Sequence, residues 1–190
     1  RQFPHADAHM TDVAVAPGRT RLPGDERRRQ LLDTAARLLV HHGTSAMSME
    51  RLAAEAGVSK ALPYKHFDNA EAVLVALYRY YFYQHRLDDA LLVAERALEV
   101  SARRLRLAGG WRNLGPRTLG EAAMRSMGML RFHLLALKGS AVILLRLGQV
   151  GEACTRLRTI AGVDLRDALG ARPLLEVIDR HYAPLSEPLD

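Results

Sequence analysis

Residues 48–69 read SMERLAAEAGVSKALPYKHFDN and carry the strongest structural signal in the chain. Ser48 is a good N-cap for a short helix that Gly57 closes. A second helix follows almost at once, with Ser59 as its cap and His66 at its end. Two short helices joined by so few residues cannot lie antiparallel, so the turn sends the second one off at a steep angle. The stretch therefore predicts a helix-turn-helix.

The rest of the chain also has the periodicity of helices. An amphipathic helix is predicted from Asp25, its N-cap, to a stop at Gly43. Asn69 is the predicted N-cap of a long helix that carries an aromatic run. Thr118 and Glu121 have the spacing of a capping box before another helix. Further helices are predicted at residues 88–107, 119–137, 140–147, 151–161 and 165–182.

The composition predicts an all-α protein. The 190 residues are 48% hydrophobic, mainly through Leu and Ala, which are strong helix formers, and alternating β-branched runs are absent. We expect a flexible N-terminal arm at residues 1–24, a three-helix helix-turn-helix domain at residues 25–70, and a helical-bundle domain for ligand sensing and dimerisation at residues 71–190. The start at Arg1 leaves open whether the first ten residues are native.

The charge suits a partner that carries phosphates, but alone leaves nucleic-acid binding at even odds. The formal net charge is +6. Cys154 is the single cysteine, so no intrachain disulfide can form, and the longest uncharged apolar run, residues 139–145, is too short to cross a bilayer. No nucleophile elbow, phosphate loop or paired metal carboxylates appear, so no enzyme, cofactor or metal site is predicted. We expect a cytoplasmic protein with no membrane partner.

A recognition helix presents its first side chains to base edges while neighbouring groups hold phosphates. Lys60 and Lys65 would meet phosphates or guanine, and Ala61 and Leu62 would touch thymine methyl groups. The arginines that begin the first helix would reach the DNA backbone or a minor groove, or would be an ordinary solvated helix start; both readings stay open. The predicted DNA-binding residues are Arg27, Arg28, Thr44, Ser48, Ser59, Lys60, Ala61, Leu62, Tyr64, Lys65 and His66.

Residues 31–77 read LLDTAARLLVHHGTSAMSMERLAAEAGVSKALPYKHFDNAEAVLVAL. They contain an A-A-x-L-L helix, an H-G turn, an S-M-x-x-L-A helix, an A-G-V-S-K turn and a Y-x-H-F ending. With these motifs the stretch resembles the N-terminal domain of the TetR family of regulators. The resemblance implies a homodimeric, all-helical DNA-binding protein, usually a repressor, that a small ligand releases from DNA. Pro63 stands where the family usually has an aliphatic residue, and Ala70 where it commonly has a phosphate-binding lysine.

The second half of the chain carries the candidates for ligand binding and dimerisation. Methionine adapts to irregular apolar space, so the helix with several methionines suits a ligand pocket, although plain core is the commoner role for such residues. The apolar stripe near the end of the chain predicts a dimer interface at Leu174, Leu175, Val177, Ile178 and Tyr182. The predicted ligand-binding residues are Tyr78, Tyr81, Phe82, Trp111, Met124, Met127, Arg131 and Phe132.

Together these features predict a homodimeric TetR-type transcriptional regulator. It would act as a repressor on a palindromic double-stranded DNA operator, and a small, largely apolar effector would release it. The alternative is a helical protein-interaction module without sequence-specific DNA binding. The sequence leaves open the effector, the operator, and whether the protein represses or activates.

Overall fold

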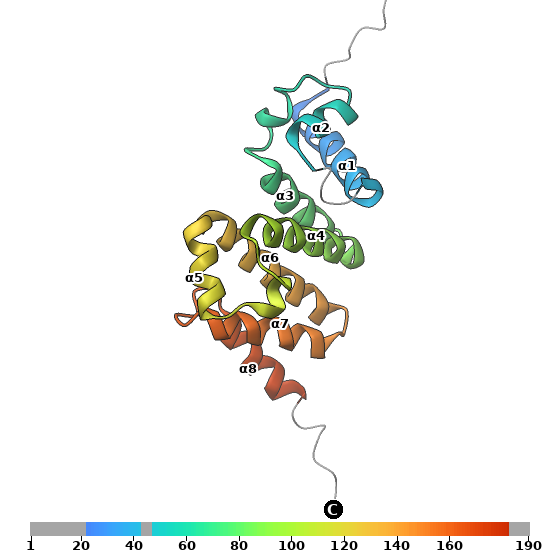
Figure 1. Cartoon of the computed structure of the whole chain (residues 1–190). Helices are drawn as coiled ribbons and strands as arrows, with labels where there is room; N and C mark the ends of the chain where they lie inside the picture. The colour runs from blue at the N-terminus through green and yellow to red at the C-terminus, as the bar shows by residue number, and fades with distance from the viewer. Residues whose placement is uncertain (1–21, 43–46, 183–190) are drawn as a thin grey trace, which may run out of the picture.

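The computed structural model describes residues 22–42 and 47–182, and every regular element in these ranges is helical (Figure 1). The all-α prediction is therefore confirmed. Most of the predicted arm, as well as Thr44, lies outside the described residues. The elements are α1 (Gly24–His42), α2 (Met49–Glu55), the 3-10 helix η2 (Pro63–Lys65), α3 (Ala70–Tyr83), α4 (Leu87–Leu105), the 3-10 helix η3 (Gly110–Asn113), α5 (Pro116–Arg125), α6 (Met127–Arg146), α7 (Val150–Val163) and α8 (Ala171–Tyr182).

Helix α3 joins the two ends of the molecule. In Figure 1 the small N-terminal group of α1 and α2 lies at one end, and the bundle of α4 to α8 lies at the other. Helix α3 packs against α1 on the N-terminal side and against α4 on the bundle side. Helix α6 packs against α4, α5 and α7, and α8 packs against α7.

One hydrophobic cluster runs through both ends of the molecule. Leu31, Leu52 and Leu77, from α1, α2 and α3, are almost fully buried in it, and Ile143 joins them from α6. A second cluster contains Trp111 of η3 and buried residues of α4, α6, α7 and α8. The first cluster therefore crosses the domain boundary that we predict near residue 70, and that boundary remains a prediction.

Helix α6 is the one described helix that is long and apolar enough to cross a membrane by length and composition alone. It lies within the bundle, where α4 and α7 both pack on it. A core helix of a bundle has this same composition, so its apolar character is accounted for by these contacts.

Two helix predictions in the middle of the chain are wrong. The expected helix over residues 119–137 is divided at Ser126, whose extended backbone ends α5 and whose hydroxyl accepts from the Met129 backbone N–H at 3.2 Å. The expected break before Ser140 does not occur, because α6 continues to Arg146. The predicted capping box is also wrong: Thr118 accepts from the Gly115 backbone N–H at 2.8 Å, so the helix begins at Pro116.

Two helix starts also differ from the prediction. The last helix was expected from Leu165 but begins at Ala171, where the Asp167 carboxylate accepts from the Ala171 backbone N–H at 2.8 Å. A short side chain that accepts backbone donors in this way stabilises a helix start. Helix α1 begins at Gly24, so Asp25 lies in its first turn rather than at the N-cap.

A polar pair is buried between α4 and α6. The Ser101 hydroxyl donates to the Ala97 carbonyl at 2.6 Å, so its oxygen accepts from Nδ1 of His133 at 2.7 Å. His133 is fully buried, and its Nε2 has no hydrogen-bond partner in the described part of the chain. Because burial penalises the charged imidazolium, the pKa of His133 is lowered to about 4.

Protonation of His133 should make the fold less stable in mild acid. The pKa in the folded state lies below the ordinary value of 6.5, so the unfolded chain takes up this proton first as the pH falls. The stability is fully present above about pH 6.5 and falls by up to about 3 kcal/mol as the pH approaches 4. Urea unfolding between pH 5 and 7 should show a smaller slope of stability against pH for His133→Gln. Equal slopes in the two proteins would contradict this account.

Candidate nucleic-acid interface and ligand cavity

The two helices around the turn begin at caps that the sequence predicted. The Ser48 hydroxyl accepts from the Arg51 backbone N–H at 3.1 Å, and the Asn69 side chain accepts from the Ala72 backbone N–H at 2.8 Å. Both residues have the extended backbone of an N-cap. The predicted N-caps of α2 and α3 are therefore confirmed. Gly57 has a positive φ of 65° after α2, a conformation that glycine adopts without strain.

The predicted recognition helix is not a regular α-helix. Residues 60–62 form a turn, and only Pro63–Lys65 are helical, as a 3-10 helix. In an α-helix the backbone N–H of residue 63 would donate to the Ser59 carbonyl, but proline has no N–H. The Leu62 N–H donates to that carbonyl instead, at 3.0 Å, which tightens the segment. Ser59 therefore does not act as the predicted side-chain cap, because the 3-10 helix is preceded by Leu62 and has no side-chain cap.

Two buried side chains and one arginine of α1 fix the inner side of this segment. Pro63 and Phe67 are buried and form its inner side. The Arg28 guanidinium lies over the Phe67 ring, 4.5 Å from the centroid, and its Nη1 donates to the His66 carbonyl at 2.8 Å. Arg28 is thus a clamp between α1 and the end of the turn.

The outer side of the segment faces solvent. No salt bridge involves Lys60 or Lys65 within the described residues. Cations that are exposed and not engaged in salt bridges can meet phosphates without first breaking a protein contact. Of the residues predicted here, Leu62 and His66 are half-buried, and the exposed ones are Ser59, Lys60, Ala61, Tyr64 and Lys65.

Tyr64 is held on this outer side by α2. Its hydroxyl donates to Glu50 Oε1 at 3.3 Å. Loss of some hydration at its hydroxyl and, after it, the neighbouring Glu50 charge raise the pKa of Tyr64, so the phenol keeps its proton. A backbone hydrogen bond and, after it, a hydrogen bond from the Ser48 side chain are the main causes that lower the pKa of Glu50, so this acceptor stays charged.

The remaining predicted DNA-binding residues have local roles in this structure. Arg27 donates to the Gln30 side chain at 2.5 Å on α1. Ser48 uses its hydroxyl oxygen for the helix cap. Contacts of these residues with DNA remain predictions.

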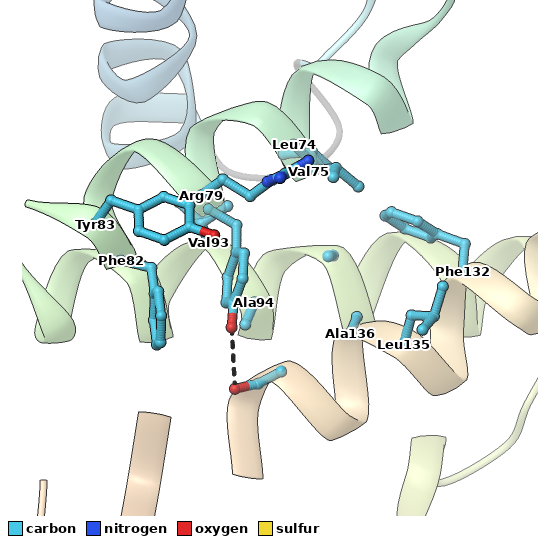
Figure 2. A pocket seen from close by; sticks show the side chains of 13 residues that line it. Leu74, Val75, Arg79, Phe82, Tyr83, Val93, Ala94, Phe132, Leu135 and Ala136 are labelled. Atoms are coloured by element: carbon cyan, nitrogen blue, oxygen red, sulfur yellow. Dashed lines mark hydrogen bonds between the residues drawn. The ribbon is translucent and has the colours of Figure 1, made fainter. Parts of the chain in front are cut away.

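An apolar cavity of about 360 Å³ lies between α3, α4 and α6, and we call it the apolar cavity (Figure 2). Figure 2 shows Phe82 and Tyr83 at one end, and Phe132 and Leu135 at the other. The Tyr78 ring stacks on Phe82, with centroids 5.8 Å apart. The lining residues are Leu74, Val75, Tyr78, Arg79, Phe82, Tyr83, Val93, Ala94, Ala97, Phe132, Leu135, Ala136 and Gly139.

Three of the predicted ligand-binding residues, Tyr78, Phe82 and Phe132, line the apolar cavity. The other five do not. Tyr81 is buried in the first cluster under the Arg86 guanidinium, and Trp111 belongs to the second cluster. Met124 is 91% exposed and Met127 is 65% exposed. Arg131 is exposed as well.

Sequence reasoning missed several cavity residues, above all Val75 and Arg79. Val75, Arg79 and Tyr83 have i, i+4 spacing on α3, which places them on one face of the helix. This i, i+4 spacing is the sequence signal that indicates a shared face. The aromatic run and the methionines are more prominent in the sequence, and they favour other residues.

The predicted dimer residues lie on α8 in two environments. Ile178 is buried against the second cluster, and Leu174 and Leu175 are partly buried on it. Val177 and Tyr182 are 49% and 51% exposed. Within the predicted set, these two side chains are therefore the most available to a second copy of the chain.

The segment that contains the turn at residues 60–65 has known relatives. The family model described as "Bacterial regulatory proteins, tetR family" matches residues 31–77. This segment is a tetR-family helix-turn-helix domain. The match begins at Leu31 within α1, covers α2 and η2, and ends at Leu77 within α3, and it confirms the predicted resemblance.

Curated relatives extend the similarity beyond this domain. An uncharacterized 19.8 kDa protein from the nifW 5' region of Azotobacter chroococcum is 43% identical over 113 residues, 60% of this chain and 63% of that protein. The transcriptional activator FasR of Mycolicibacterium smegmatis is 36% identical over 46% of this chain and 39% of its own. The transcriptional regulator BetI of Rhizobium meliloti is 38% identical over 37% of this chain and 34% of its own. FasR and BetI are named as transcriptional regulators, which agrees with the prediction of a regulator rather than an enzyme.

The chain thus spans less than two thirds of the length of each of these relatives. Among solved structures, the fatty acid degradation regulator FadR of Bacillus halodurans covers 73% of this chain and 78% of its own. Its identity is 20% and its TM-score is 0.30, a likeness too distant to support an argument.

The cap of α3 should contribute measurably to the stability of this domain. Asn69→Ala removes the acceptor for the Ala72 N–H and should lower the free energy of unfolding by about 1 kcal/mol. Asn69→Asp keeps an acceptor and should remain close to wild type. Urea unfolding followed by circular dichroism measures both, and equal stability of all three proteins would refute the role of the cap.

Proposed function

We propose that this chain is a DNA-binding transcriptional regulator that acts as a homodimer on a palindromic operator. The observation that carries the proposal is the exposed cationic turn at Lys60–Lys65 in a tetR-family domain. Its inner side is held by Pro63, Phe67 and the Arg28 clamp, so the outer side is presented in a defined orientation. Base edges in the major groove are read by side chains presented in this way.

We propose further that a small, largely apolar ligand in the apolar cavity releases the protein from DNA, which makes it a repressor. Helix α3 begins directly after the turn and supplies six of the residues that line the cavity: Leu74, Val75, Tyr78, Arg79, Phe82 and Tyr83. A ligand that favours one position of α3 therefore changes the placement of the turn. Differential affinity for the two positions is what couples ligand to DNA.

The cationic turn is tested with DNA selected from a random duplex pool. The purified protein should enrich palindromic sequences, and binding should weaken steeply with salt. Lys60→Ala and Lys65→Ala should each weaken binding across sequences and reduce the slope of log affinity against log salt by about 1. Arg117→Ala, at an exposed arginine of α5, is the matched control and should bind like wild type. Failure to enrich any duplex at low salt would favour the alternative of a protein-interaction module.

Dimerisation through α8 is tested by solution mass. Sedimentation should give twice 21.1 kDa for the wild-type chain. Val177→Glu places a charge in the proposed interface and should yield the 21.1 kDa monomer, because an unpaired charge is costly to bury. Arg180→Ala, on the same helix, should leave the dimer intact. A dimer that is unaffected by Val177→Glu would place the interface elsewhere.

A further inference from the structure

A second hollow adjoins the apolar cavity on the side of the helix-turn-helix. This groove, which we call the α1–α3 groove, has a volume of about 720 Å³. Val75, Arg79 and Tyr83 line both hollows, so the groove and the cavity meet along one face of α3. In Figure 2 the Arg79 side chain runs along α3 toward Val75 at the rim of the cavity. The groove is lined by Arg28, Leu32, Ala72, Val75, Ala76, Arg79, Tyr80, Tyr83 and Gln84.

The charge of the two hollows has one sign. Among the described residues, Arg28 and Arg79 are the only charged side chains in the linings, and no carboxylate of the described chain lines either hollow. Arg79 forms no hydrogen bond or salt bridge in the part of the chain that the structure describes. An arginine at the rim of an apolar cavity, with its donors unused, suits a carboxylate or phosphate oxygen.

We propose that the two hollows form one site for an amphipathic anion, with its apolar tail in the apolar cavity and its anionic head between Arg79 and Arg28. The tail replaces water against Phe82, Phe132 and Leu135, which is the favourable term for apolar surface. The head remains in the open groove, where it is not required to lose its hydration completely. Only the effect of the bound anion on DNA affinity rests on the proposed function. The binding of the anion to the two hollows does not depend on that function.

The head would act on the turn through Arg28. The Arg28 Nη1 donates to the His66 carbonyl, and its guanidinium covers Phe67. The hydrogen bond from Arg28 to the neutral carbonyl has one ionised partner, whereas a hydrogen bond from Arg28 to an anion has two and is stronger. A bound head therefore draws Arg28 away from His66 and releases the end of the turn, which lowers the affinity for DNA.

Calorimetry with sodium dodecanoate below its micelle concentration, and with dodecanol as the uncharged match, tests the site. Dodecanoate should bind the wild-type protein more tightly than dodecanol does. Arg79→Gln should weaken dodecanoate binding by about ten- to one-hundred-fold and leave dodecanol unchanged, because only the charged head loses its partner. Arg79→Lys should recover part of the affinity. Equal binding of the two compounds, or an unchanged dodecanoate affinity in Arg79→Gln, would overturn the proposal.

Two further measurements distinguish binding at this site from the effect of Arg28 on the turn, and both of these from the proposed function. Ala136→Phe, which fills the cavity, should abolish binding of both compounds, and binding that survives would show attachment at the surface only. Amide hydrogen exchange at residues 62–67 should accelerate when dodecanoate is added to the wild-type protein, but not in Arg28→Gln. Unchanged exchange would refute the proposed release of the turn through Arg28. None of these readouts uses DNA, so a protein that binds dodecanoate but no duplex would overturn the proposed function alone.

Discussion

The double packing of α3 is the constraint on which the rest of this structure depends. Its residues Val73, Leu74 and Leu77 are almost fully buried, and the helix packs on α1 and on α4. The first hydrophobic cluster therefore contains residues from α1, α2, α3, α4 and α6 without interruption. Closely packed interiors transmit displacement rather than absorb it. A continuous packed path therefore connects the helix that lines the cavity with the turn that follows α2.

The same helix separates two kinds of surface. One end of α3 is continuous with the cationic turn, and its other end carries the aromatic side chains of the apolar cavity. Arg79 and Tyr83 stand between the cavity and the α1–α3 groove. The clamp from Arg28 to His66 then connects this groove to the turn. A short series of direct contacts thus joins the two hollows to the candidate DNA-binding surface.

The sequence predicts a helix start correctly where a single side chain sets the local backbone conformation. Ser48 and Asn69 cap their helices as expected, because each side chain satisfies a backbone N–H within three residues. The predicted helix break around Gly139 is wrong. A Cβ there would lie 3.2 Å from the Tyr78 ring, so this glycine permits a close contact within a continuous helix. Such a contact joins residues 61 positions apart, and no local pattern reports it.

Helical periodicity, turn chemistry and charge by themselves determined the fold class, the helix-turn-helix and the residues of its cationic turn, because these properties arise between neighbours in the chain. Tertiary structure alone decided which apolar residues line a cavity. Met124 and Met127 have the same spacing and character as core residues but lie exposed, while Val75 lines the cavity together with residues of α4 and α6. The reason is physical: an apolar side chain is compatible with core, cavity or interface, and only the packing of distant helices selects among them.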